Sequence, residues 1–563
     1  MNSRIWTAPS SSFEKPARSE SPGICVDQGT VAASMSGLRL QRRVLTPGAP
    51  PAYLLVVPAV VGAAMLLPPA YLVVRALSAD AGELAGLLAR PRTLELLGNT
   101  VALAAAVLGT TTAVALPLAW LTVRTAMPLR RTVTVMAVLP LAVPGYVAAF
   151  ALLSVGGDTG LLASVGLPVA RPSGLVGATL ALSIYSFPYM FLNIRASLLG
   201  MDPAVEESAR SLGYGPARVF VSVILPMLVP GIAAGALITV LYTIGDFGAV
   251  ALMRYEVFSY VIYTQYVGAF DRTYASALAL VLLLLAAGPV LLEATFLSSR
   301  RFLHADQVTV RLPRRVALGW WHLAVWPFLL VVAAGSVGLP LISPAFEMLR
   351  HPPWGQLQGV LGAFANSARA AAPAAVVATA VAVPIAYVRV RYPTRAGLVA
   401  ERVSYIGFAV PPLALALSLV FFSLRVIPPL YQRLPLLIGA FVLNFLALAV
   451  GPIRSTFMKL PRRIEEAART LGYGPVAAFF AAVLPAAREG LRASALLVLV
   501  MAMKELPMTT LLAPTGFTTL STAVFARTSE ALYAEAAPYA AAIVLFSCLF
   551  VGLILRYESE VTP

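Results

Sequence analysis

The sequence predicts an all-α integral membrane protein with about twelve transmembrane helices, arranged as two parallel six-helix repeats. Hydrophobic residues make up 59% of the 563 residues and charged residues only 12%. Soluble domains carry roughly one-quarter charged residues, so this composition indicates that lipid surrounds most of the chain. The net charge is +16, but the basic residues lie mainly in short loops between apolar segments. We therefore expect membrane lipid and no nucleic acid as a partner.

Twelve continuous apolar segments are long enough to cross about 30 Å of hydrocarbon. Because these segments do not alternate polar and apolar residues, helices are favoured over a β-barrel. The expected helices cover residues 53–75, 98–121, 133–155, 174–194, 222–245 and 275–297, and then 318–343, 367–388, 403–424, 435–453, 493–513 and 536–555.

The distribution of basic residues predicts the orientation of the chain. With the N-terminus inside, the inner loops and tails hold 29 Lys and Arg residues and the outer loops hold 10. Basic residues concentrate on the cytoplasmic side of membrane proteins, so both termini are expected in the cytoplasm of a bacterial cell, with the chain in its inner or plasma membrane. Residues 1–50 lack an apolar core and are rich in Ser and Pro. They are expected to form a disordered basic cytoplasmic tail, not a signal peptide.

The two halves of the chain are related by an internal repeat. At a shift of 259 positions, residues 206–232 and 465–491 are identical at 13 of 27 positions. Upstream the shift becomes 267, which pairs Asn99-Thr100 with Asn366-Ser367 and the segment 142–144 with 409–411. Both halves contain six helices of the same orientation, so the repeat is parallel and not inverted.

The most similar segments of the repeat are polar loops that contain LGYGP. Asp202-Pro203 is expected to start a short helix, in which Glu206 and Arg210 have the spacing of an ion pair. Gly213 can end that helix in the left-handed conformation. Gly215-Pro216 then turns the chain into a second helix. The alternative, a solvated connection without a function, gives no reason for two copies at equivalent places.

These loops resemble the EAA loop of permeases from binding-protein-dependent ABC importers, whose pattern is Glu-Ala-Ala, three residues, Gly, nine residues, a hydrophobe, one residue and Leu-Pro. The second copy has Ala482 where the family usually has Ile, and the first copy has Ser208 in place of the middle Ala. The residues expected to form the two ATPase-coupling loops are Glu206, Glu207, Ala209, Gly213, Gly215, Leu225 and Pro226, and then Glu465, Glu466, Ala467, Ala468, Gly472, Gly474, Leu484 and Pro485.

The resemblance implies two ABC importer type-1 permease modules, each coupled to one copy of a cytoplasmic ATPase. The modules are expected at residues 95–297 and 362–555, preceded by helices 53–75 and 318–343, with a cytoplasmic linker at 298–317. No GxxxxGK[ST] motif occurs in the chain. ATP and Mg are therefore expected on a separate subunit, and this chain is expected to be neither an enzyme nor a cofactor-binding protein. A periplasmic or extracellular binding protein would deliver the cargo, which would cross by alternating access.

The cargo is suggested by a finer resemblance to ferric-iron permeases. That resemblance rests on the fused layout, on Gly245–Ala249 with IYTQY at 262–266, and on Lys504–Thr509 with PTGF at 514–517 and SEALYAEAA at 529–537. Thiamine permeases share the fused layout, and polyamine, sulfate and molybdate permeases share the EAA loop. A secondary transporter driven by an ion gradient fits twelve helices equally well but gives no reason for two EAA loops.

Asp246, Lys504 and Glu505 are the candidates for the translocation path. Asp246 and Glu505 occupy equivalent positions, expected in the outer half of the fifth helix of each module. Intramembrane ionisable groups are costly and usually face a bundle interior or a cavity. The alternatives are an ion pair of Glu505 with Lys504 or Arg369, or exposure at the outer surface. The tyrosines of 254–274 fit an interfacial aromatic belt better than a ferric site, and the three scattered histidines predict no metal site.

Overall fold

The computed structural model describes residues 50–77, 82, 86, 89–268, 272–299 and 315–561. Almost all of the expected tail and most of the expected linker lie outside these described residues. Ala49–Pro563 form one compact unit.

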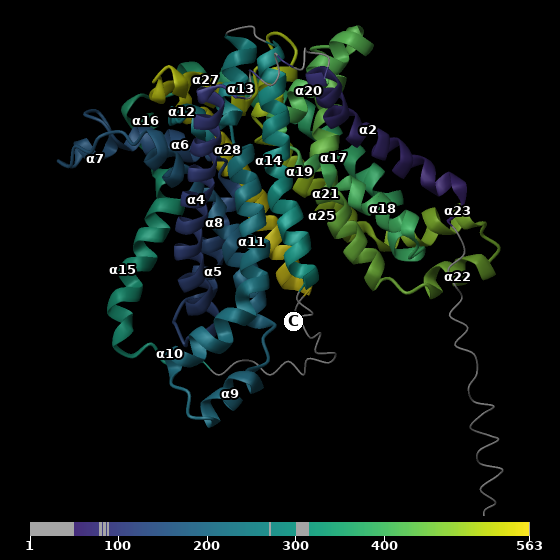
Figure 1. Ribbon diagram of the computed structural model, residues 1–563, viewed down its shortest axis with the longest axis horizontal. Coiled ribbons are helices and arrows are strands. Elements are labelled where there is room, and N and C mark those ends of the chain that lie inside the picture. The colour runs from purple at the N-terminus through teal and green to yellow at the C-terminus, as the bar shows by residue number, and fades with distance from the viewer. Residues whose placement is uncertain are drawn as a thin grey trace, which may run out of the picture. The chain divides into compact units, whose positions relative to one another are not determined.

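The helices of the first half follow the expected order, with short turns between the long spans (Figure 1). Their bounds are α2 Ala52–Leu77, α4 Pro91–Arg124, α5 Arg130–Val138, η1 Leu139–Ala142, α6 Gly145–Val155, α7 Leu161–Ser164, α8 Gly174–Leu199, α9 Pro203–Ser211, α10 Pro216–Val219, η2 Phe220–Ile224, α11 Leu225–Gly245, α12 Gly248–Leu252, α13 Phe258–Val267 and α14 Arg272–Ser299.

The second half repeats this order. Its elements are η3 Gly319–Trp321, α15 His322–Ala333, η4 Ala334–Gly338, α16 Leu339–Arg350, η5 Trp354–Gln356, α17 Leu357–Arg391, α18 Arg395–Ser404, α19 Ile406–Ala409, α20 Pro412–Val426, η6 Pro428–Leu430, α21 Leu434–Lys459, α22 Arg463–Thr470, α23 Pro475–Ala478, η7 Phe479–Val483, α24 Leu484–Ala486, α25 Arg488–Met503, α26 Pro507–Leu512, α27 Leu520–Ser529 and α28 Tyr533–Val561.

The all-helical membrane fold is confirmed. In the described part of the chain, nine helices are long and apolar enough to cross a membrane, and two bent pairs can each be one further span. These eleven spans match eleven of the expected helices. The expected helix 493–513 is the exception, because α25 ends at Met503. Pro507 has no N–H to donate to the Met503 carbonyl, so the helix cannot continue through this turn unbroken.

Each of the two bent pairs breaks at a proline. The segments Arg130–Ala142 and Gly145–Val155 meet at 99°, and Arg395–Ala409 and Pro412–Val426 meet at 98°. Pro144 and Pro411, which the repeat pairs at a shift of 267, lie at the two corners. Proline lacks the backbone donor that a continuous helix needs, so both halves bend at the same place.

A second proline effect occurs at three Leu-Pro pairs. A π-helical turn directly precedes Leu225-Pro226, Leu484-Pro485 and Leu339-Pro340. Proline removes one i→i−4 hydrogen bond and its ring crowds the carbonyl of the preceding turn, which a wider π turn relieves. The Leu-Pro pairs of both expected coupling loops therefore mark a local widening at the start of the fifth helix of each half.

The leading helix of each half packs across the repeat boundary. α2 contacts α17, α18 and α20 of the second half as well as α14 of its own. In return, α15 packs on α5, and α16 packs on α6 of the first half as well as on α28. The two halves are therefore interlocked and are not separate bundles side by side.

The repeat also appears in hydrogen bonds that join distant segments. The Asn99 amide donates to the Glu256 carbonyl at 2.9 Å. The Thr100 hydroxyl accepts from the Phe258 N–H at 3.3 Å. The second half repeats both bonds, from the Asn366 amide to the Thr518 carbonyl at 3.0 Å and from the Leu520 N–H to the Ser367 hydroxyl at 3.0 Å.

Candidate functional site

The first LGYGP segment connects two short helices, α9 and α10, and the residues that start and end them are those that the sequence predicts. Asp202 caps α9, and its carboxylate accepts from the Ala204 N–H at 2.9 Å. Gly213 has φ +85°, as expected for the residue that ends this helix. α10 starts at Pro216, where the missing N–H costs nothing.

The second loop has the same conformation. Gly472 has φ +93°, and α23 starts at Pro475. A Cβ atom added to Gly213 or Gly472 would meet nothing within 4 Å. Glycine is therefore required at both positions by the backbone conformation and not by lack of space. Gly215 and Gly474 have negative φ and only cap the next helix.

Each motif has an inner and an outer face. Ala209 and Ala468 are buried, whereas Glu207, Glu466 and Ala467 are exposed.

Figure 1 shows α9 and α22 on the lower side of the compact unit and α12 and α27 on its upper side. The remaining members, Gly215, Leu225, Pro226, Gly474, Leu484 and Pro485, lie in the turns and helix starts that follow α9 and α22.

A buried ion pair ties α9 to the end of α4. Arg124 Nη1 donates to Glu206 Oε2 at 2.7 Å, and these side chains are only 4% and 14% exposed. Arg210 Nη2 donates to the other oxygen, Glu206 Oε1, at 2.7 Å, as the i,i+4 spacing predicts. Glu206 therefore faces the body of the protein, whereas the adjacent Glu207 faces outward.

The second half has the corresponding but looser tether. Glu465 Oε1 accepts from the Tyr387 hydroxyl at 3.0 Å and from Arg469 Nη2 at 3.1 Å. Arg391 Nε lies 3.9 Å from Glu465 Oε2. Sequence reasoning did not single out Arg124 and Arg391, although the shift of 267 pairs them. The repeated Arg at the end of equivalent helices was the signal that could have identified them.

A cavity of about 160 Å³ lies at the other end of α11 and α25. α11 has 21 residues, and a helix of that length covers about 30 Å, so the cavity is separated from α9 and α22 by nearly the thickness of a membrane. Both proline corners line the cavity, together with Asp246, Lys504 and Glu505. The structure therefore brings the three candidate residues together. Their predicted position inside the fifth helices was wrong, because α11 ends at Gly245 and α25 at Met503.

The two carboxylates cap equivalent short helices. Asp246 Oδ1 accepts from the N–H groups of Ala249 and Val250 at 2.9 and 3.4 Å. Asp246 Oδ2 accepts from the Tyr185 hydroxyl at 3.2 Å. The Ser259 hydroxyl donates to the Asp246 carbonyl at 2.5 Å. Asp246 is half-buried. Its Oδ1 caps α12, whereas its Oδ2 accepts a hydrogen bond from the Tyr185 hydroxyl.

Glu505 lies in the turn before α26 and is held by the first residues of that helix. Its Oε1 accepts from the Met508 N–H at 2.8 Å, and its Oε2 accepts from both the N–H and the hydroxyl of Thr509 at 3.0 Å. The Ser521 hydroxyl donates to the Glu505 carbonyl at 2.7 Å. Glu505 is only 7% exposed. Its carboxylate stabilises α26, and the Glu505 side chain is less exposed than that of Asp246.

Lys504 joins the two halves through backbone groups. Its Nζ donates to the Leu141 carbonyl at 2.7 Å, and its own carbonyl accepts from the Tyr146 hydroxyl at 3.1 Å. Among the ion pairs of the described residues, none joins Glu505 to Lys504 or Arg369. The ion-pair alternative for Glu505 is therefore not what this structure contains.

The lining of the cavity is chemically one-sided. The first half contributes four tyrosines, Tyr146, Tyr185, Tyr189 and Tyr242. At a shift of 259, the residues of the second half that correspond to Tyr185 and Tyr242 are Asn444 and Met501. The rings of Tyr189 and Tyr242 stack at 4.7 Å between centroids. The tyrosines of 254–274 are not part of this lining. Over the described residues, no group of three or more His, Cys, Asp and Glu side chains is placed to hold a metal ion.

Two interlocked helical modules, each with an EAA-type loop, define the membrane subunit of an ABC importer. The model of the family described as "Binding-protein-dependent transport system inner membrane component" matches residues 112–304 and 375–558. The chain belongs to this family, and two matched segments confirm the fused double module.

Curated relatives name different cargoes. The chain is 30% identical over 516 residues to the Fe(3+)-transport system permease protein FbpB 2 of Haemophilus influenzae, which covers 91% of this chain and 99% of that protein. The molybdenum transport system permease protein ModB of Escherichia coli is 37% identical over 116 residues, 20% of this chain and 50% of that protein. The probable sulfate transport system permease protein cysT of Chlorella vulgaris is 32% identical over 168 residues, 28% of this chain and 62% of that protein.

Proposed function

We propose that this chain is the permease of an ATP-driven importer that carries ferric iron from a periplasmic or extracellular binding protein into the cytoplasm. The observation that carries the proposal is the match to an Fe(3+)-transport permease over 91% of this chain and 99% of the relative. The molybdenum and sulfate relatives instead match within a fifth to a third of the chain.

The cavity chemistry supports a hard cation as cargo. Its first-half wall presents phenol oxygens and the Asp246 carboxylate. Hard cations prefer oxygen ligands, in contrast to soft metals, which prefer thiolates. The Tyr185–Asp246 pair offers two such oxygens 3.2 Å apart, which suits a brief contact during passage.

The coupling loops would be driven by two copies of a separate ATPase that binds ATP and Mg. Glu207 and Glu466 face outward from α9 and α22, where a partner can reach them. Glu206 and Glu465 face inward and join these helices to α4 and α17. Closure of the ATPase pair would move α9 and α22, and the tethers would pass that movement to the long helices. The two modules then rock about the cavity and expose it to one side at a time.

A transport assay with the assembled importer tests the proposal. The permease, its ATPase and its binding protein are reconstituted in liposomes, and ATP-dependent uptake of labelled ferric iron is measured. We expect uptake that requires both the ATPase and the iron-loaded binding protein. Iron uptake driven by an ion gradient without ATP would instead support a secondary transporter.

Oxyanion import is the second candidate function. Lys504 places a cationic side chain in the cavity lining, and the molybdenum and sulfate permeases are relatives. The same liposomes with labelled molybdate or sulfate and a matching binding protein distinguish the two. Uptake of an oxyanion without uptake of ferric iron would refute the iron proposal and leave the permease role intact.

A further inference from the structure

A second pocket in the first half is lined by arginines. It has a volume of about 320 Å³, and Arg130, Arg131, Arg195 and Arg315 all line it, together with Thr134. These residues come from α5, from α8 and from the chain that leads into η3. Arg124, which borders this segment of α4, extends instead to Glu206 of α9. The pocket therefore lies at the end of the molecule that carries the coupling helices.

The position of Arg315 is set by backbone hydrogen bonds. Thr125 and Val316 form an isolated parallel β-bridge. The Val316 N–H donates to the Arg124 carbonyl at 2.9 Å, and the Ala126 N–H donates to the Val316 carbonyl at 3.0 Å. The chain that enters the second half is thus tied to the end of α4, which holds Arg315 over the pocket.

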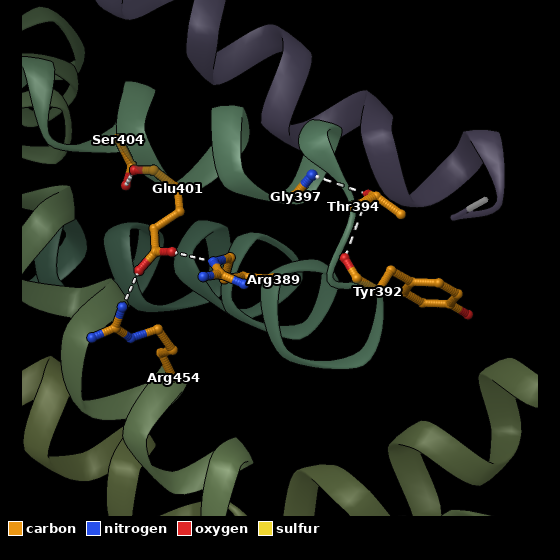
Figure 2. A network of polar contacts seen from close by, with 7 residues as sticks. All are labelled: Arg389, Tyr392, Thr394, Gly397, Glu401, Ser404 and Arg454. Carbon is orange, nitrogen blue, oxygen red and sulfur yellow. Dashed lines mark hydrogen bonds and ion pairs between the residues drawn. The ribbon is translucent and has the colours of Figure 1, made fainter. Parts of the chain in front are cut away.

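The equivalent place in the second half contains a carboxylate. Figure 2 shows Glu401 of α18 between Arg389 of α17 and Arg454 of α21. Arg389 Nε donates to Glu401 Oε2 at 2.6 Å, and Arg454 donates to the other oxygen. Glu401 is 5% exposed. The buried carboxylate compensates one of the two guanidinium charges from within the chain and bonds to both groups.

The first half lacks this internal carboxylate. The repeat pairs Arg454 with Arg195 at a shift of 259 and Glu401 with Thr134 at a shift of 267. Of the two basic members, Arg454 is thus retained as Arg195, whereas Arg389 corresponds to Thr122 and the acidic Glu401 is replaced by Thr134. Arg130 and Arg131 add two further positive charges where the second half has Gly397 and Leu398.

Arg195 Nε is buried and has no hydrogen-bond partner, and the same is true of Arg454 Nε in the second half. The two sites therefore differ in their ion pairs and not in this atom. Within the described ranges, no ion pair includes Arg130, Arg131, Arg195 or Arg315. Arg130, Arg131 and Arg315 are exposed and Arg195 is half-buried. Four neighbouring positive charges repel one another unless an anion compensates them. Basic residues used only for membrane orientation need no such cavity.

We propose that this pocket binds a phosphate-type anion, which takes the place of the carboxylate that Glu401 supplies in the second half. Guanidinium groups form two parallel hydrogen bonds to phosphate oxygens, and several of them can surround one group. The phosphate can belong to the headgroup of an anionic phospholipid or be free inorganic phosphate. The volume of about 320 Å³ is roughly ten times the share of one water in the liquid, about 30 Å³, and admits either.

The pocket is joined to the coupling machinery through adjacent residues. Thr122 and Val123 line it, and the next residue, Arg124, holds Glu206. An anion that orders this end of α4 therefore also orders the tether of the first coupling helix, whereas the second half has the same order built in.

The test uses the full chain in nanodiscs and the substitution Thr134→Glu, which restores the second-half pattern. The matched control is Thr132→Glu, which adds the same charge at an exposed position two residues away on α5. Retention of phosphatidylglycerol is measured by native mass spectrometry after release from the nanodisc. Binding of labelled inorganic phosphate is measured in nanodiscs of phosphatidylcholine alone.

We expect the wild type and Thr132→Glu to bind one of the two probes and Thr134→Glu to bind it about tenfold more weakly, because the introduced carboxylate occupies the guanidinium groups. Loss of phosphatidylglycerol retention alone identifies a lipid headgroup, and loss of phosphate binding alone identifies the free anion. Arg195→Gln provides a second variant with the same expected loss. Equal binding by Thr134→Glu and Thr132→Glu, or no binding of either probe to the wild type, would overturn the proposal.

Discussion

Replacing Glu206 by Gln removes one charge from the tether between α9 and α4 and keeps the size of the side chain. Arg124 then keeps its charge at 4% exposure without its carboxylate partner. Breaking a buried pair in this way costs about 3–5 kcal/mol. Loss of the half-exposed pair with Arg210 adds only about 0.3–0.5 kcal/mol.

The second tether provides the matched comparison. Arg391 lies 3.9 Å from Glu465 and also donates to the Leu460 carbonyl at 3.3 Å. A Gln at position 465 can still accept from the Tyr387 hydroxyl, so we expect a cost of about 1 kcal/mol. The difference of at least about 2 kcal/mol corresponds to a roughly 30-fold difference in a local opening equilibrium.

Hydrogen exchange of the purified permease measures this opening directly. For each variant, the exchange rate is divided by that of the same amides in the wild type. This acceleration should be about 30-fold larger for α9 in Glu206→Gln than for α22 in Glu465→Gln. Glu207→Gln is the control, because the exposed Glu207 is no part of the tether. Adding Arg124→Met to Glu206→Gln should slow exchange again, since it removes the unpaired buried charge. Equal exchange of α9 in Glu206→Gln and Glu207→Gln would refute the buried tether.

Two further predictions concern the loops and the cavity. Gly213→Val and Gly472→Val should each reduce the ATPase activity that the loaded binding protein stimulates and leave membrane insertion unchanged, because the left-handed conformation costs an L-residue about 1–2 kcal/mol. Gly213→Asn should retain most of that stimulation, and wild-type stimulation in both Val variants would contradict the docking role. Asp246→Asn should reduce ferric-iron uptake about tenfold with little loss of thermal stability, because Asp246 is only half-buried and its carboxylate accepts hydrogen bonds of 2.9–3.4 Å. Glu505→Gln should mainly lower the unfolding temperature, because Glu505 is 7% exposed and its carboxylate accepts shorter hydrogen bonds of 2.8–3.0 Å. Uptake assays and thermal unfolding of both variants check this, and unchanged uptake in Asp246→Asn would remove that residue from the path.

The features that the sequence by itself determined all depend on short stretches of chain. Apolar length predicts the spans, since lipid leaves the backbone no partners outside a helix. The break at Gly213 and the start at Pro216 follow from backbone chemistry within a few residues. The internal repeat then predicted that the two LGYGP loops have the same backbone conformation and the same role. The end of α25 at Met503 was missed, because the expected helix 493–513 was extended across Lys504, Glu505 and Pro507 to the apolar residues that follow.

Only the tertiary structure decided which distant residues meet. The Arg124–Glu206 tether joins residues 82 positions apart, and the Lys504–Leu141 hydrogen bond joins residues 363 positions apart. Neither pairing follows from local spacing, because the first depends on how α4 packs against α8 and α11 and the second on the proline corner that follows η1. The same packing gives equivalent positions different surroundings, with Glu401 between two arginines in one half and Thr134 in the lining of the arginine pocket in the other. A repeat in sequence therefore predicts equivalent backbones, whereas the partners that each side chain finds are set by the assembled bundle.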